Sequence, residues 1–302
     1  MDEELHGPEP LSGSWLVTGV GHDGTRPALE LRSLVSASEK RIETIGSHLS
    51  FRVFGPRRCI GYRAPDSPRL VPCPESSELL RGNQCEACVE RAQLIPCLRC
   101  TGLRCSNPAR RAECVQPENH AVYLASFGPG MMKVGVARWH RRRERLVEQG
   151  AAAALIVARD DGLLARRLEA TIRAFGVADR ASNTERLSAM WCADDIASMR
   201  SELGLLAEGL RRRLTNTAWL PRPEIVDLPP ITQIASPAPW VHPRDQDVFE
   251  AEVIATAGQW VVIDRFGARE ALELVSLVGY AIQPEAEASA PAAEHQMALP
   301  LG

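Results

Sequence analysis

Eight of the nine cysteines in this chain lie close together in the sequence, and this cluster constrains the fold more than any other feature. The segment around them, residues 57–119, contains many Pro and Gly residues and little periodic apolar pattern. Such a segment cannot bury enough carbon to fold alone, so we expect bound metal to hold it together. The eight are Cys59, Cys73, Cys85, Cys88, Cys97, Cys100, Cys105 and Cys114.

Two Cys-x-x-Cys pairs indicate zinc as that metal. Each pair has the spacing of a zinc knuckle, in which a tight turn presents two thiolates to one tetrahedral ion. Eight thiols make two four-ligand sites, so we expect two zinc ions. The short interval between the pairs favours separate ions. We assign Cys59, Cys73, Cys85 and Cys88 to one ion, and Cys97, Cys100, Cys105 and Cys114 to the other.

Three alternatives stay open for this segment. The two sets of ligands can interleave, His120 can replace a cysteine, and an iron–sulfur cluster would use the same thiols. We favour zinc because it suits soft thiolates in closed tetrahedra without redox chemistry. The ninth cysteine, Cys192, stands outside the cluster, and we expect it to be a buried thiol.

Charge is distributed unevenly along the chain. The formal net charge of the 302 residues is −3, which taken as a whole argues against a nucleic-acid partner. Residues 51–190, however, contain 23 Lys and Arg against 14 Asp and Glu, a net charge of +9, while the two flanks together sum to −12. A basic segment of this kind favours a phosphate-bearing partner, so we expect nucleic acid to bind at the middle of the chain.

The sequence also indicates a compartment. No stretch approaches the roughly 18 apolar residues of a membrane span, and the start, Met1-Asp2-Glu3-Glu4, lacks the basic lead of a signal peptide. We therefore expect a cytoplasmic protein without a membrane partner, in which the cysteines are thiols or metal ligands rather than disulfides. The sequence indicates no particular protein partner.

The N-terminal segment, residues 1–56, is expected to be β. Its clearest signal is Asp23-Gly24 between two apolar runs, which predicts a hairpin turn. The same stretch contains Gly19-x-Gly21-x-x-Gly24, the pattern of a dinucleotide-binding turn. That turn needs a helix to start at its third glycine, and Pro27 opposes one, so we favour the hairpin.

The rest of the chain divides by its apolar pattern. Residues 120–190 predict the order strand, strand, helix, strand, helix, and 191–218 an amphipathic helix. The many prolines of 219–247 indicate a linker, and 248–282 a second β segment, which we expect to pair with the first into one small β domain. The Pro, Ala and Glu residues of 283–302 predict a disordered tail.

The run VYLASFGPGMMKVGVARWHRRRERL, which starts at Val122, resembles the opening of GIY-YIG nuclease domains. Tyr123 lies in the first motif of that family and Lys133 begins the second, Lys133-Val134-Gly135. Arg143 stands where the family keeps an essential arginine, Glu169 where it has a metal-binding glutamate, and Asn183 where an asparagine closes its site. More closely, residues 57–190 resemble an uncharacterised bacterial family that joins a cysteine-rich zinc segment to such a domain.

This resemblance implies a metal-dependent phosphodiesterase site. Glu169 would bind Mg²⁺ or Mn²⁺, Arg143 would bind the phosphate, and Tyr123 would hold or activate the attacking water. Lys133 replaces the second tyrosine of the family and can act as a base only if its pKa is lowered. Val147 replaces a histidine often found one helical turn beyond the arginine. The predicted contacts to nucleic acid are Arg138, Arg141, Arg142 and Arg145.

We therefore expect an α+β fold in which a double zinc-binding module precedes a GIY-YIG-like mixed domain and small β segments flank both. The predicted function is binding of DNA or RNA by a zinc-containing protein with a metal-dependent endonuclease site. Two alternatives stay open. One is a non-catalytic nucleic-acid-binding or regulatory protein on the same scaffold, and the other is an enzyme acting on a small nucleotide-like substrate.

Overall fold

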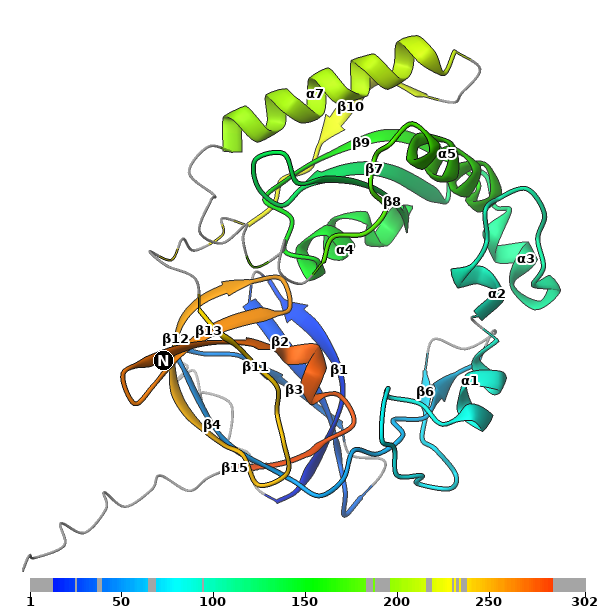
Figure 1. The fold of residues 1–302 in the computed structure, drawn as a ribbon. Coiled ribbons are helices and arrows are strands. Elements are labelled where there is room, and N and C mark those ends of the chain that lie inside the picture. Colours follow the sequence, from blue (N-terminus) through cyan, green and yellow to red (C-terminus); the bar gives the residue numbers. More distant parts are fainter. Residues whose placement is uncertain are drawn as a thin grey trace, which may run out of the picture.

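The computed structural model has three parts, which Figure 1 shows arranged as an arc. A large sheet is built from both ends of the chain and a smaller sheet from its middle, and the cysteine-rich segment lies beside both along the arc. The structure describes residues 13–24, 26–36, 40–64, 69–93, 95–182, 187, 196–215, 219–229, 231, 234 and 238–284. Within these residues, no helix combines the length and the apolar character that crossing a membrane requires.

The large sheet has nine strands in the order β11-β14-β13-β12-β4-β15-β1-β2-β3. Its strand β15 lies between β4 and β1 and is antiparallel to both. Ile282 of β15 faces Trp15 of β1 on one side and Val53 of β4 on the other. The expected pairing of the two ends of the chain is therefore confirmed. The strands are β1 (Trp15–Asp23), β2 (Arg26–Ser33), β3 (Lys40–Thr44), β4 (His48–Phe54), β11 (Trp240–Val241), β12 (Val248–Ala257), β13 (Trp260–Arg265), β14 (Ala268–Glu273) and β15 (Ala281–Pro284).

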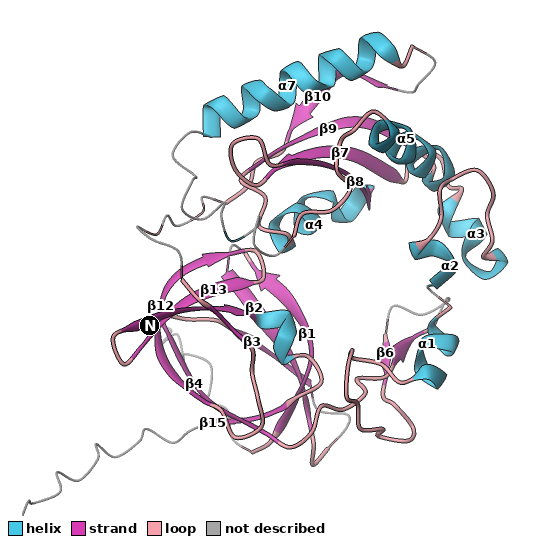
Figure 2. Cartoon of the chain, viewed as in Figure 1, coloured by secondary structure: helices cyan, strands magenta, loops and turns pink. Residues whose placement is uncertain are grey.

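One face of this sheet supplies its core. In β4 every second side chain, Leu49, Phe51 and Val53, is buried, as expected of a strand with one apolar face. Phe51 packs on Phe249 of β12 with ring centroids 5.3 Å apart. Figure 2 shows the strands curving around this core, to which the short 3₁₀ helix Leu274–Leu277 adds two buried leucines.

The predicted N-terminal hairpin is confirmed. Strands β1 and β2 pair as far as Asp23 and Arg26, and the turn between them contains Gly24 at φ +62°, a left-handed conformation that glycine adopts without steric cost. Because Pro27 lies in β2 and no helix follows the glycines, the structure excludes the dinucleotide-binding turn.

The smaller sheet has the order β10-β9-β7-β8. The predicted succession strand, strand, helix, strand, helix is confirmed, as is the amphipathic helix that follows. The expected linker differs, since its first residues form β10, which pairs with β9. Helices α5 and α7 pack on one face of the sheet and α4 on the other. The elements are β7 (His120–Ser126), β8 (Met132–Arg138), the 3₁₀ turn Trp139–Arg141, α4 (Arg142–Glu148), β9 (Ala153–Asp160), α5 (Gly162–Ala174), α7 (Ile196–Arg213) and β10 (Trp219–Ile225).

The cysteine-rich segment has little regular structure and contacts both sheets. At one end its backbone is hydrogen-bonded to the region of the large sheet, because the Arg58 N–H donates to the Gly279 carbonyl oxygen. At its other end Gly102 lies so close to α5 that an added Cβ would stand 2.1 Å from the Leu163 carbonyl oxygen. The elements are β5 (Tyr62–Arg63), β6 (Leu70–Val71), α1 (Glu86–Ala92), α2 (Ile95–Leu98) and α3 (Pro108–Cys114).

The expected fold class, an α+β fold of GIY-YIG type flanked by small β segments, is wrong. The protein is mostly β, and its flanks combine into a sheet with more strands than the mixed sheet has. The physical reason is that each short strand needs a partner for its backbone and for its apolar face, and the partners come from opposite ends of the chain. The predicted tail also starts too early, because residues 283–284 belong to β15. Residues 285–302 lie outside the described part of the chain.

Candidate functional site

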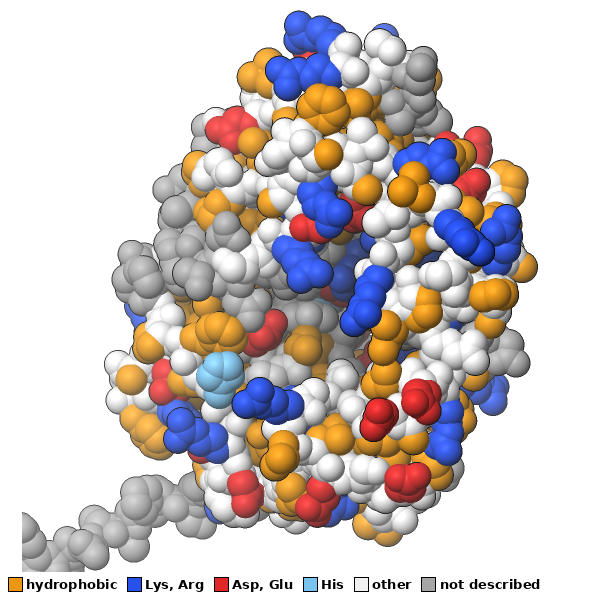
Figure 3. Space-filling model, turned by 45° about the vertical axis from the view of Figure 1, so that its right-hand side comes forward, with side chains coloured by type: hydrophobic (Ala, Val, Ile, Leu, Met, Phe, Trp, Pro, Cys, Tyr) orange, Lys and Arg blue, Asp and Glu red, His pale blue; other side chains and the backbone are white. Residues whose placement is uncertain are grey.

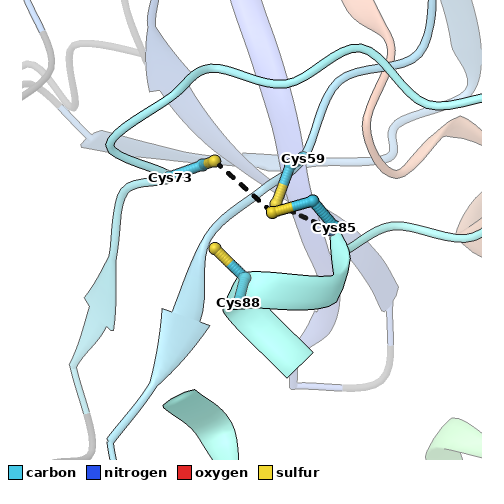
Figure 4. Close-up of side chains that lie close together, drawn as sticks. All are labelled: Cys59, Cys73, Cys85 and Cys88. Atoms are coloured by element: carbon cyan, nitrogen blue, oxygen red, sulfur yellow. Dashed lines mark hydrogen bonds between the residues drawn. The ribbon is translucent and has the colours of Figure 1, made fainter. Parts of the chain in front are cut away.

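Four cysteine thiols converge on one point and make the candidate metal centre of the protein. Figure 4 shows Cys59, Cys73, Cys85 and Cys88 with their sulfurs directed toward one another. All four sulfurs lie within 4.8 Å of one another, and those of Cys73 and Cys85 are 3.8 Å apart. Zinc–sulfur bonds of about 2.3 Å in a tetrahedron place the sulfurs about 3.8 Å apart, so the cluster fits a single zinc ion. The first predicted ligand set is therefore a four-cysteine cluster that could hold a metal such as zinc.

Local structure explains why these thiols meet. Cys85 precedes α1 and Cys88 lies in its first turn, so the Cys-x-x-Cys spacing brings both sulfurs to one end of the helix. The backbone N–H of Cys85 donates to the Cys59 sulfur at 3.2 Å. Gly61 has φ +101°, and an added Cβ would stand 1.9 Å from the Val71 carbonyl oxygen. Glycine therefore allows the two chain segments that contain Cys59 and Cys73 to approach each other.

The four thiols differ in their readiness to ionise. At Cys73 burial favours the thiol, but hydrogen bonds from the backbone of Ser77 and Glu75 outweigh it and hold the pKa at about 6. Burial, and then hydrogen bonding to the neighbouring thiols, raises the pKa of Cys88. Burial also raises the pKa of Cys59. A bound divalent cation would favour the thiolate form at all four.

Arg32 of β2 connects this centre to the large sheet. Its side chain is buried and donates from Nη1 to the Ile60 carbonyl oxygen at 3.2 Å. Burial lowers the pKa of Arg32, and the thiols of Cys59 and Cys73 act in the opposite direction. The guanidinium therefore supplies positive charge beside a site that becomes anionic when the thiols ionise.

The second predicted set of cysteines is arranged differently. The thiols of Cys97, Cys100, Cys105 and Cys114 line one cavity of about 240 Å³, together with His120. They are close enough for the other three to contribute to the raised pKa of Cys114, whose main cause is burial. Among the described residues, however, only the Cys59 set brings its sulfurs within 4.8 Å of one another. A second zinc ion at this cavity stays a prediction.

A basic pocket of about 400 Å³ lies between the large sheet and the cysteine-rich segment. Five cationic side chains and one carboxylate are among the residues that line it. Arg32 and Lys40 stand directly opposite each other on β2 and β3. Such a like-charged pair is destabilising unless an anion offsets it. The charged lining residues are Arg32, Lys40, Arg41, Arg63, Arg69 and Glu30.

Sequence reasoning missed this pocket because its cations come from β2, β3, β5 and the residue before β6, which are separated in the sequence. Carboxylates of the described chain lie near two of these cations. Arg63 lies 3.7 Å from Glu30, and Arg41 lies 3.0 Å from Glu43. One signal was available, since Lys40 is one of the two lysines in a chain whose other basic residues are arginine.

Three of the five predicted catalytic residues lie in one region of the mixed sheet. Tyr123 is 2% exposed, and its hydroxyl is bonded to the Gln149 amide at 3.0 Å. The Lys133 ammonium lies 5.9 Å from the centre of the Tyr123 ring. Burial raises the pKa of Tyr123, and the charge of Glu169 contributes in the same direction. Glu169 itself pairs with Arg166 at 2.8 Å.

The other two predicted catalytic residues do not join this group. The Arg143 side chain donates from Nε to the Asp227 carbonyl oxygen at 2.9 Å, on the exposed side of α4. Asn183 lies outside the described residues. The structure therefore places Lys133 beside Tyr123 and Glu169 near enough for its charge to act on Tyr123, while Arg143, predicted to bind the phosphate, bonds elsewhere.

The four arginines predicted to contact nucleic acid all have acidic partners in the chain. Arg138 pairs with Glu113. Arg141 and Arg145 both pair with Glu148, at 2.6 and 3.0 Å. Arg142 pairs with Glu224 at 3.2 Å and stacks on Trp139. Their charges are thus partly offset, although Figure 3 shows Lys and Arg side chains gathered around a hollow in the middle of one face of the molecule.

Comparison with known proteins places the chain in a family. Residues 46–282 match a family described as a protein of unknown function, DUF2797. No curated protein and no solved structure matches the chain. These comparisons show neither a GIY-YIG family nor a zinc-module family. Of the predicted resemblances, they support only the one to an uncharacterised family. Because the match includes more than half of the chain, the protein belongs to the DUF2797 family.

Proposed function

We propose that this protein binds nucleic acid through phosphate contacts in the basic pocket, with the neighbouring four-cysteine centre acting as a structural zinc site. The observation that carries the proposal is the lining of the pocket, in which five cations face one carboxylate. Arg32 and Lys40 are also held directly opposite each other. A phosphate group would offset the repulsion between them, whereas an uncharged ligand would not.

The position of the pocket supports a polymeric partner. It adjoins the segment with a net charge of +9, and the Lys and Arg side chains of one face surround a hollow (Figure 3). Successive phosphates of a nucleic acid would contact several of these side chains at once. The paired arginines in α4 and in the turn before it would then act mainly by positioning this helix, since Glu148 already binds Arg141 and Arg145.

Metal is part of this proposal. Zinc at Cys59, Cys73, Cys85 and Cys88 would fix β5 and β6. Arg63 lies in β5, and Arg69 directly precedes β6, so both line the pocket from this part of the chain. The other four cysteines of the cluster line a separate cavity, and we expect a second metal centre there.

Binding is tested with labelled single- and double-stranded DNA and RNA at several salt concentrations. Wild-type protein should bind at low salt, and the double variant Lys40→Ala, Arg69→Ala should bind more weakly to every sequence. The slope of log K against log salt should fall by about 2, because two phosphate contacts are lost. The matched control, Arg212→Ala with Arg213→Ala, removes the same charge from exposed positions on α7. Equal losses in both variants, or no binding by the wild type, would contradict the proposal.

Phosphodiester cleavage is a second candidate function. It is favoured by the proximity of Lys133 to the Tyr123 ring and by the charge of Glu169 acting on Tyr123. We place it second because Tyr123 and Lys133 are 2% and 7% exposed, so a substrate would reach them only after the site opens.

The cleavage candidate is tested by incubating the same nucleic acids with Mg²⁺ or Mn²⁺. Cutting that is lost in Glu169→Gln and kept in Glu208→Gln, a change at an exposed carboxylate on α7, would support a catalytic site. Intact nucleic acid with wild-type protein and either metal would exclude cleavage and leave the binding proposal unaffected.

A further inference from the structure

We propose that Cys97, Cys100, Cys105 and Cys114 bind an iron–sulfur cluster rather than a single zinc ion. This inference is independent of nucleic-acid binding. It rests on the cavity between α2, α3 and the start of α5, on the separation of its four sulfurs, and on the polar groups around them.

The size of the cavity is the first argument. A four-coordinate zinc ion fills the space between its ligands and leaves none for solvent. The cavity lined by these four cysteines measures about 240 Å³. A water molecule occupies roughly 30 Å³ of liquid, so this cavity holds the volume of several waters. A group with several heavy atoms, such as an iron–sulfur cluster, therefore has room in this cavity beside the four thiols.

The separation of the sulfurs is the second argument. In the described chain the Cys59 set brings its sulfurs within 4.8 Å of one another, and the Cys97 set does not. A cube of iron and sulfide places several bonds between its thiolate ligands, so it needs four sulfurs that surround a space rather than touch. The sulfurs of the Cys59 set have the close spacing that a single ion requires, and those of the Cys97 set have the wider spacing that a cluster requires.

Hydrogen bonds to the sulfurs are the third argument. The Asn107 side-chain amide donates to the Cys97 sulfur at 3.2 Å, and the Gly102 backbone N–H approaches the Cys100 sulfur at 3.4 Å. Such N–H···S contacts stabilise thiolates, and they tune iron–sulfur clusters in proteins. Asn107 is itself buried, and its amide also donates to the Gln93 carbonyl oxygen at 2.6 Å, which fixes its orientation.

The charge of the cavity wall is the fourth argument. Arg110, Arg138 and Arg166 line the cavity with one carboxylate, Glu113. A cluster with four thiolate ligands is a net anion. Arg138 pairs with Glu113 and Arg166 with Glu169, but the three arginines still outnumber the one carboxylate that lines the cavity, so its wall would offset part of the cluster's charge. The buried Nδ1 of His120, which also lines the cavity, has no hydrogen-bond partner in the described part of the chain. A group bound in the cavity would supply that partner to His120.

The test is metal and sulfide analysis of the full-length protein, purified without oxygen from iron-supplied cells and then reconstituted with ferrous iron and sulfide. We expect a brown protein with about one zinc per chain and with iron and acid-labile sulfide in equal amounts. The variant Cys97→Ser, Cys100→Ser should lose iron and sulfide and keep its zinc. The matched variant Cys85→Ser, Cys88→Ser should lose zinc and keep the visible absorption of the cluster.

Two zinc ions per chain and no acid-labile sulfide in the reconstituted wild-type protein would overturn the inference. Iron that stays in Cys97→Ser, Cys100→Ser at the wild-type level would overturn it as well, because that iron would lie elsewhere. The wild-type analysis does not depend on whether either variant folds. A colourless protein that binds nucleic acid, or a brown one that does not, separates this inference from the proposed function.

Discussion

At the scale of single residues, the contact between Tyr123 and Gly135 determines what the mixed sheet can do. The two residues face each other on β7 and β8, and the tyrosine ring lies over the glycine so closely that an added Cβ would stand 2.4 Å from its hydroxyl oxygen. The resemblance indicated Tyr123 through its first motif and Gly135 through its second, but it could not show that the ring would be buried and bonded to Gln149. Burial depends on packing partners that a local pattern does not specify.

Replacing Gly135 by alanine should therefore destabilise the protein by about 1–3 kcal/mol, the usual effect of overpacking a buried site. The control is Gly204→Ala in α7, where an added Cβ meets nothing within 4 Å and alanine should raise helix stability by up to about 1 kcal/mol. Urea unfolding of both variants measures the difference. Equal stability of the two would show that Tyr123 moves without cost.

His22 gives the protein a pH dependence near neutrality. Its Nε2 lies 3.0 Å from the Gly258 carbonyl oxygen, and burial lowers its pKa below 6.5 despite that bond and the nearby carboxylates of Glu148 and Glu144. The unfolded chain takes up a proton at a higher pH than the folded one. The stability contributed by a neutral His22 is therefore complete above pH 6.5 and is lost as the pH falls through that value.

We expect the free energy of unfolding of the wild type to exceed that of His22→Gln at about pH 8, and the difference to shrink at about pH 5.5. Urea unfolding at both pH values measures it. A difference that is the same at both values would show that His22 titrates normally in the folded protein.

At the scale of elements, the sequence pattern predicted helices, strands and turns that depend on neighbouring residues, and it missed features that join segments far apart in the sequence. The β1–β2 hairpin, β7, β8, β9 and α5 follow from apolar period and turn chemistry, and Cys85-x-x-Cys88 indicated two ligands of the metal centre. The strand β10 was expected as linker because its prolines oppose pairing, yet it pairs with one neighbour at the edge of its sheet. The basic pocket was missed because no local period joins its strands.

Removing bound metal should unfold the segment around α1 and leave the mixed sheet folded. Helix α1 has seven residues, too few for stability alone, and the buried cluster around it consists largely of cysteines of the candidate metal centre. With a zinc chelator, amide hydrogen exchange should speed up in residues 59–64 and 69–93 and stay slow in β7 and β9. Protection that is unchanged in both regions would show that metal is not needed for this part of the fold.

At the scale of the whole molecule, the two ends of the chain form one sheet and the middle is inserted between them. The strand patterns of the two flanking segments predicted that they pair, but not the number of strands in the sheet, because each strand gives only its own pattern and not its partner. The metal centre and the basic pocket both lie where the insertion meets the large sheet, since Arg32 of β2 contacts the backbone at Ile60 and lines the pocket.

Deleting residues 240–302 should prevent folding of the N-terminal strands. The deletion removes β12 and β15, so β4 loses both neighbours and β1 loses one. We expect little soluble protein and strong binding of a hydrophobic dye. Deleting residues 285–302 removes no described strand and should leave the circular dichroism spectrum unchanged. Soluble, folded protein from the longer deletion would show that the first four strands are a domain alone.

The place of β15 between β4 and β1 also sets an order of events during synthesis. Because β15 follows every other described strand along the chain, the first strands leave the ribosome long before the partner that joins them exists. Their unpaired edges are then open to association with other chains. We expect the cysteine-rich segment and the mixed sheet to fold during this interval, so that metal is loaded before the large sheet closes.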